Sequence, residues 1–261
     1  MHYLFLVLFF PIFSFINIFG QSVNYTKCSF TDSSATMDFS YLRYKVYTFK
    51  PYFIEVNLVT QKGYLYSRDG KVKVFGISSG TEKVQDGVKT NEGLFVVQAK
   101  LPEWYSRQFD STLMLNWIGF NFGIGFHALQ TSGYYVYLGK EKSSHGCIRV
   151  SRYIAKELYK LIDKGTPVLV HSENNIIELG FADSTKKYES YSYKRLYKMM
   201  NNLYQELYTG RYFLSDHPLL LIYNENVHHQ GLPIGDSNKI LKRQIIKSTY
   251  EFLTAIIPEY K

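Results

Sequence analysis

The segment from Ser143 to Arg149 contains the residues best suited to chemistry. It reads Ser-Ser-His-Gly-Cys-Ile-Arg, so Cys147 directly follows a glycine and a histidine, and a second histidine, His127, lies twenty residues upstream. A cysteine in a glycine-containing loop, with histidines within reach, can act as a thiolate nucleophile. We therefore predict a cysteine-dependent acyl-transfer site in this loop.

Such a nucleophile needs a base for its proton and N–H donors for the oxyanion that forms when a carbonyl is attacked. His127, which ends an apolar stretch, is the candidate base. The backbone around Ser144, His145 and Gly146 is the candidate oxyanion loop, and Gly146 lets the substrate approach without a Cβ in the way. Each residue also has a purely structural interpretation, such as a small core cysteine or a hydrogen-bonded core histidine. Their joint occurrence favours catalysis.

The chain has two cysteines. A disulfide between Cys28 and Cys147 would remove the nucleophile, and this is the structural alternative for an exported chain. We favour a free Cys147, because a structural disulfide does not require flanking histidines. The scattered histidines match no zinc-ligand spacing, so we expect no metal and no cofactor.

Residues 1–22 predict export. The stretch Tyr3–Phe19 is almost wholly apolar, and Gly20-Gln21-Ser22 offers small and polar residues for cleavage. No basic residue precedes the apolar stretch, and about 17 residues is the shortest apolar helix that spans a bilayer. The segment is therefore predicted to be a signal peptide or an uncleaved membrane anchor, which places the protein in the periplasm or cell envelope.

The composition is that of a folded protein in polyanionic surroundings. With 46% hydrophobic and 20% charged residues, general disorder is excluded. The net charge of +8 favours cell-wall polymers, anionic lipid or nucleic acid, and charge alone does not choose among them. The 24 tyrosines and 19 phenylalanines fit either a stacking surface or the codon bias of an AT-rich genome.

Short strands with glycine-rich turns are expected to position the site. Alternating or apolar runs predict strands at 52–59, 63–67, 71–77, 93–99 and 113–126, and Asp69-Gly70 is typical of a hairpin turn. After Cys147, the sequence predicts a helix from the N-cap Ser151 to about Gly165, then a strand at 166–170. This pattern favours a β-sandwich or barrel over a nucleotide-binding layer fold, so the fold class is mainly β (α+β).

The flanking regions differ from this β domain. Residues 23–50 are predicted to be an irregular lead-in. Residues 173–261 are predicted to be a helical C-terminal extension, with one helix near 193–207 and a second at 237–257. Basic residues on the second helix fit either a solvated face or a face directed to a membrane or polymer.

The residues around the loop resemble the L,D-transpeptidase (YkuD-type) catalytic domain. The resemblance covers about residues 51–172 and rests on His127, sixteen further residues, then Ser144-His145-Gly146-Cys147-Ile148-Arg149. Segments 77–80, 90–95 and 117–120 follow the family's order.

This resemblance implies a substrate and a role for each residue. Cys147 would attack the tetrapeptide stem of peptidoglycan and form a thioester, with His127 as base, its ring oriented by the carbonyl of Ala128. Arg149 stands where part of the family has asparagine, and suits a carboxylate-bearing stem. The implied partners are peptidoglycan stems and a wall-anchored acceptor protein, with no nucleic acid and with membrane contact only through residues 1–22.

Departures from the family affect the acceptor side. The chain has Lys89-Thr90-Asn91-Glu92 in place of the usual Thr-Pro, and His127-Ala128 in place of His-Gly. An amine acceptor would make the protein a transpeptidase, and water would make it an L,D-carboxypeptidase. A non-catalytic wall-binding module is the alternative from another class.

Overall fold

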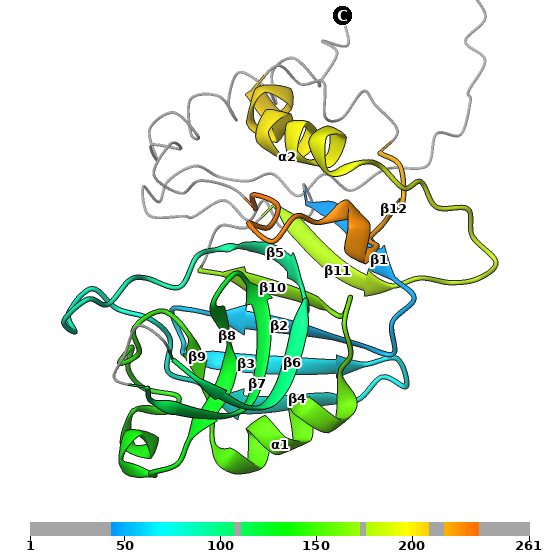
Figure 1. Cartoon of the computed structure of the whole chain (residues 1–261). Helices are drawn as coiled ribbons and strands as arrows, with labels where there is room; N and C mark the ends of the chain where they lie inside the picture. Colours follow the sequence, from blue (N-terminus) through cyan, green and yellow to red (C-terminus); the bar gives the residue numbers. More distant parts are fainter. Residues whose placement is uncertain (1–42, 107–110, 173–175, 209–216, 235–261) are drawn as a thin grey trace, which may run out of the picture. The chain divides into compact units, whose positions relative to one another are not determined.

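The computed structural model describes residues 43–106, 111–172, 176–208 and 217–234 (Figure 1). These residues form three β-sheets and two α-helices, which confirms the mainly β (α+β) prediction. The predicted export segment and the second C-terminal helix lie outside the described residues. Within the described part of the chain, neither helix is long and apolar enough to cross a bilayer.

The first sheet has five strands in the order β4-β3-β2-β10-β5. Its strands are β2 (Tyr52–Asn57), β3 (Lys62–Ser67), β4 (Val72–Gly76), β5 (Gly93–Val96) and β10 (Pro167–His171). β2, β3 and β4 are antiparallel neighbours, and β10 lies parallel to β2 and antiparallel to β5. The Asp69-Gly70 turn joins β3 to β4 as predicted, and Gly70 has a positive φ of 85° that glycine adopts without strain.

The second sheet has the order β6-β7-β8-β9 and contains His127, Ala128 and Arg149 of the predicted site residues, and the Cys147 loop leads directly into β9. Its strands are β6 (Ala99–Tyr105), β7 (Leu113–Asn121), β8 (Ile124–Leu129) and β9 (Ile148–Arg149). A short connection makes β7 and β8 an antiparallel hairpin, whereas β9 runs parallel to β8. A 3-10 helix, η2 (Gly133–Tyr137), lies in the connection from β8 to the Cys147 loop.

The main core contains side chains from both sheets. Ile54, Val56 and Val168 of the first sheet join Ile118 and Phe126 of the second in one fully buried cluster. Alternate residues of each strand face this core, as a half-buried pleated strand requires.

Helix α1 (Arg152–Leu161) follows the Cys147 loop and packs on β7 and β8 (Figure 1). The Ser151 side chain accepts a hydrogen bond from the Ile154 N–H, which confirms the predicted N-cap. Leu158 and Ile162 bring the helix into the main core, so the chain is fixed immediately after the loop.

The third sheet corrects two predictions. Its strands, β1 (Tyr44–Thr48), β11 (Ile177–Phe181) and β12 (Leu220–Leu221), are parallel and have the order β11-β1-β12. The prediction of an irregular lead-in is therefore wrong for residues 44–48, which form β1. The prediction of a helical extension is wrong for residues 177–181 and 220–221, which form β11 and β12. β1 pairs with strands more than a hundred residues away, which local sequence patterns do not reveal.

The extension also builds a second core on the other face of the first sheet. Helix α2 (Tyr193–Tyr208) confirms the helix predicted near 193–207, and a 3-10 helix, η3 (Asn224–Asn226), follows β12. Leu196 and Met200 of α2 are buried in one cluster with Leu94 of β5 and Leu169 of β10. β5 and β10 are thus covered on both faces, one by each core.

Candidate active site

The Cys147 loop is held by hydrogen bonds to two segments that precede it in sequence. Ser144 donates its N–H to the Ser79 carbonyl (3.0 Å) and accepts at its own carbonyl from the Thr81 N–H (3.0 Å). The Thr90 hydroxyl accepts from the Gly80 N–H (2.9 Å) and donates to the Gly146 carbonyl (2.7 Å). The Thr90 side chain therefore links Gly80 to Gly146, the residue before the cysteine.

Gly146 is required by the conformation of this loop. Its φ is +140°, and a Cβ there would lie 2.9 Å from the Val88 side chain. Gly80 makes a similar close approach, because a Cβ on Gly80 would lie 2.5 Å from the Gly146 Cα. The two glycines let the Gly80 and Gly146 backbones pack directly against each other, which positions the residue before Cys147.

Strand register places Cys147 and His127 on one face of the second sheet. Phe126 pairs with Ile148 and His127 pairs with Arg149. Phe126 and Ile148 point into the main core, so His127, Arg149 and Cys147 lie on the opposite face. The predicted base thus lies on β8, and the predicted nucleophile directly precedes β9, the strand that pairs with β8. Among the described residues, no hydrogen bond joins the two side chains.

A β-bulge lies opposite His127. Leu115 pairs with Ala128 and Ile118 pairs with Phe126, so two residues of β7, Asn116 and Trp117, oppose the single residue His127. Asn116 adopts a positive φ of 51°, a conformation that asparagine tolerates better than most residues. Bulges of this kind redirect a side chain.

The redirected side chain is that of Trp117, whose ring lies across Gly119. A Cβ on Gly119 would come within 2.1 Å of the indole, so only glycine leaves this space open. Trp104 stacks on the indole with ring centroids 5.7 Å apart. The Trp117 Nε1 is buried and, among the described residues, has no acceptor in hydrogen-bond geometry. The indole makes the smallest of three contributions that oppose the rise in the pKa of the Cys147 thiol.

The Cys147 sulfur lies over the β7–β8 hairpin. Cys147 is a free cysteine with partial solvent exposure, and its thiol lies 3.5 Å from the Gly123 carbonyl, which it can donate to. The protein atoms crowded around the sulfur raise the pKa of the Cys147 thiol above its ordinary value. The Gly125 N–H, the positive charge of Arg149 and the Trp117 indole oppose this rise.

His127 is a buried, neutral imidazole. Its side chain is 4% exposed, and its Nδ1 lies 3.1 Å from the carbonyl of Ala128. When Nδ1–H donates to that carbonyl, Nε2 is left as a proton acceptor. Burial, with a contribution from the charge of Arg149, lowers the pKa of His127 to about 4. The resting pair at neutral pH is therefore a thiol and a neutral imidazole, not an ion pair.

Arg149 supplies a positive charge that acts on both Cys147 and His127. Its guanidinium donates to the Ser143 carbonyl (3.0 Å), and its Nε is buried without an acceptor among the described residues. Its backbone exchanges two hydrogen bonds with Ser78, which fixes the strand. Burial lowers the pKa of the Arg149 guanidinium, which nevertheless stays charged at neutral pH.

The loop N–H groups differ in their availability to an oxyanion. The Gly146 N–H donates to the Ser144 hydroxyl (3.1 Å), and that hydroxyl in turn donates to the Cys147 carbonyl. The Cys147 N–H has no acceptor within the described part of the chain. His145, which is half-buried, accepts at its carbonyl from the Val88 N–H (3.3 Å). Ser144 and Gly146 thus shape the loop, and the Cys147 N–H is the donor that remains open.

Sequence reasoning missed Trp117, Gly125 and the role of Thr90. Trp117 lies in an apolar run and is expected to be an ordinary core residue, and only the asparagine before it suggests a bulge. Gly125 is one of several glycines in the apolar run 113–126, and nothing in the sequence distinguishes it from the others. Thr90 departs from the family pattern, and the structure gives it a bridging position.

The chain is similar to one family of known proteins. Residues 51–170 match the model of the YkuD family, described as the L,D-transpeptidase catalytic domain. A Bacillus subtilis (strain 168) protein named "Putative L,D-transpeptidase YciB" is 29% identical over 129 residues, which cover 46% of this chain and 66% of that protein.

Two solved structures are also similar to the chain. An L,D-transpeptidase from Mycobacterium smegmatis is 22% identical, with a TM-score of 0.40, over 46% of this chain and 58% of the other. An L,D-transpeptidase from Stackebrandtia nassauensis is 25% identical, with a TM-score of 0.39, over 47% of this chain and 56% of the other. The chain thus spans about two thirds of the curated relative and somewhat more than half of each solved structure. Residues 51–170 of the chain are thus similar to the L,D-transpeptidase catalytic domains of the YkuD family.

Proposed function

We propose that the protein is a cysteine L,D-transpeptidase that acts on peptidoglycan tetrapeptide stems through a thioester on Cys147. The observation that carries the proposal is the placement of Cys147 and a neutral, carbonyl-bound His127 on one face of adjacent strands. A thiol nucleophile, a base in a fixed tautomer and N–H groups directed at the sulfur meet the requirements of acyl transfer.

The first half of the reaction forms the thioester. His127 Nε2 accepts the thiol proton as the sulfur attacks the carbonyl carbon before the terminal D-residue of the stem. The Cys147 N–H donates to the oxyanion. The carbon–nitrogen bond then breaks, and His127 returns the proton to the leaving amine. The Gly125 N–H, the Arg149 charge and the Trp117 indole stabilise negative charge on the sulfur.

The second half releases the enzyme. An amine of a second stem, or of a wall-anchored acceptor protein, attacks the thioester carbonyl, passes its proton to His127 and leaves Cys147 as the free thiol. Arg149 stands next to the reacting pair, and its charge suits the carboxylate of an incoming stem. The proposed location is the periplasm or cell envelope, consistent with the apolar N-terminal stretch of the sequence.

The alternative acceptor is water, which would make the protein an L,D-carboxypeptidase with the same cysteine and base. Incubation of the full chain with a disaccharide-tetrapeptide, followed by mass spectrometry, separates the two. Crosslinked dimer indicates transfer, and tripeptide alone indicates hydrolysis. A non-catalytic wall-binding module would give neither product, and Cys147→Ala would then behave like the wild type.

A further inference from the structure

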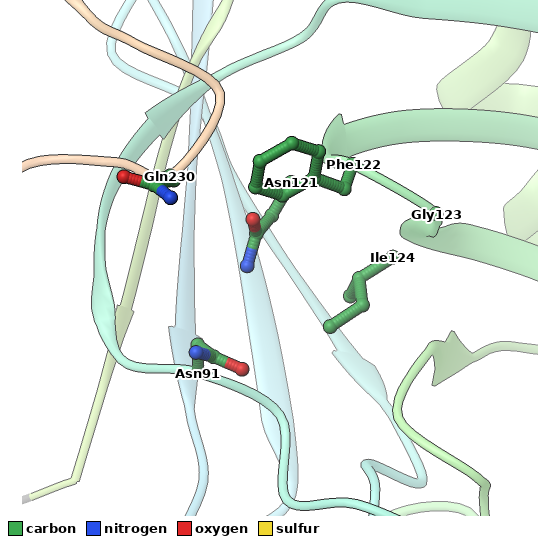
Figure 2. Close-up of a pocket in the computed structure, with 6 residues that line it drawn as sticks. All are labelled: Asn91, Asn121, Phe122, Gly123, Ile124 and Gln230. Atoms are coloured by element: carbon green, nitrogen blue, oxygen red, sulfur yellow. The ribbon is translucent and has the colours of Figure 1, made fainter.

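A pocket of about 330 Å³ lies at the β7–β8 turn, which also contacts the Cys147 sulfur. It is lined by Asn91, Asn121, Phe122, Gly123, Ile124 and Gln230 (Figure 2). The middle residues form the turn between β7 and β8, and the Gly123 carbonyl lies 3.5 Å from the Cys147 sulfur. Only Gln230 lies outside the segment that matches the catalytic-domain family.

The extension segment that carries Gln230 is fixed in place on both sides. Leu232 and Leu94 exchange two backbone hydrogen bonds, of 2.9 and 2.8 Å. Gly231 has a positive φ of 76°, and a Cβ there would lie 2.4 Å from the Phe95 ring, so this turn packs directly on β5. The His229 ring packs edge-on against Phe122, with centroids 4.1 Å apart. Gln230 is therefore held at the pocket by its neighbours.

The chemistry of the lining is neutral and rich in amides. Figure 2 shows the side chains of Asn91, Asn121 and Gln230 around one space, with Ile124 across from them. A carboxamide offers one acceptor oxygen and two donor hydrogens, which complement the C=O and N–H groups of a peptide. None of the six lining residues is ionisable, so a free carboxylate or ammonium would lose solvation here without gaining a partner charge.

We propose that Gln230 completes a subsite for an uncharged, amide-bearing segment of the peptide substrate beside the thioester position. The inference rests on the proposed function and deepens it, because it assigns part of the extension to substrate recognition. The extension thus has two roles in the structure: it covers the back of the first sheet, and it closes one side of the substrate pocket.

The test compares Gln230→Ala with Asn224→Ala in the full chain. Asn224 is an exposed amide of the same extension and packs near Gly165, so its loss controls for a general effect on the extension. Binding of the tetrapeptide is measured by calorimetry in a Cys147→Ala background, which prevents turnover. One lost neutral hydrogen bond predicts about a three- to tenfold weaker Kd for Gln230→Ala, with no change for Asn224→Ala.

Turnover by the variants that retain Cys147 gives the second readout. Gln230→Ala should raise KM by a similar factor with little change in kcat, and Gln230→Glu should raise it further by placing a charge in a neutral pocket. Equal Kd and KM for Gln230→Ala and wild type would overturn this inference and leave the proposed function standing. If wild type itself fails to release the D-residue, the proposed function fails. A selective loss of tetrapeptide binding in Gln230→Ala would then still support the subsite, and equal binding would refute it.

Discussion

The buried indole of Trp117 offers a direct perturbation of the thiol. Trp117→Phe removes the N–H that acts on the Cys147 sulfur but keeps an aromatic ring over Gly119. Burial raises the pKa of the Cys147 thiol, and the indole is one of three groups that oppose this rise. Loss of the indole N–H should therefore raise the pKa of Cys147 further.

The assay is alkylation by iodoacetamide as a function of pH, in a Cys28→Ser background that leaves Cys147 as the remaining thiol of the sequence. At a fixed pH below the pKa, the alkylation rate should fall, because the thiolate is the reactive form. Trp104→Phe is the matched control, since Trp104 stacks on Trp117 and is 37% exposed. The reasoning is refuted if Trp117→Phe titrates like the wild type, or if Trp104→Phe shifts the pKa equally while both variants unfold at the same temperature.

The remaining predictions concern the base and the loop. Since burial lowers the pKa of His127 to about 4, the acid limb of kcat/KM should lie near pH 4 and not near the ordinary 6.5, and a limb near 6.5 would contradict a buried neutral base. Between pH 4 and 6.5, the unfolded chain binds more protons at this residue than the folded chain does. Lowering the pH from 7 to 5 should therefore reduce the free energy of unfolding by about 2 kcal/mol. Denaturant titrations should show that this pH dependence disappears in His127→Gln. Thr90→Val should lower the free energy of unfolding by about 1–3 kcal/mol, because it leaves the Gly80 N–H and the Gly146 carbonyl unpaired. Thr90→Ser keeps the hydroxyl and should therefore retain both the stability and the kcat of the wild type. Gly146→Ala should strongly lower kcat while the protein still folds, because it strains the loop at φ +140°. Unchanged turnover would contradict this, since it would show that the loop accommodates a side chain without strain.

The sequence signals for the candidate pair are local. Cys147 lies between a strand and a helix whose N-cap, Ser151, is evident from the sequence, and His127 lies in a strand with clear apolar character. The pairing of β8 with β9 is what the structure adds. The strands of the main sheets and helix α1 were predictable for the same reason, since alternation and capping act over a few residues.

The missed features depend on register and on distant pairing. The bulge at Asn116 adds one residue to β7, so simple alternation does not reveal that Trp117 turns toward the cysteine. β1 pairs in parallel with β11 and β12, which are far away in the chain. Gln230 reaches the pocket only because Leu232 pairs with Leu94. No pattern within a short window encodes such contacts.

The central claim is a thioester on Cys147, and mass spectrometry of the intact protein tests it most directly. After brief incubation of the full chain with a disaccharide-tetrapeptide, we expect a mass increase equal to the mass of the substrate minus that of the released D-amino acid, which is the disaccharide-tripeptide acyl group. Peptide mapping should place this adduct on Cys147, and Cys147→Ala should give neither adduct nor released D-residue. Release of the D-residue by Cys147→Ala, or an adduct on another residue, would contradict the account.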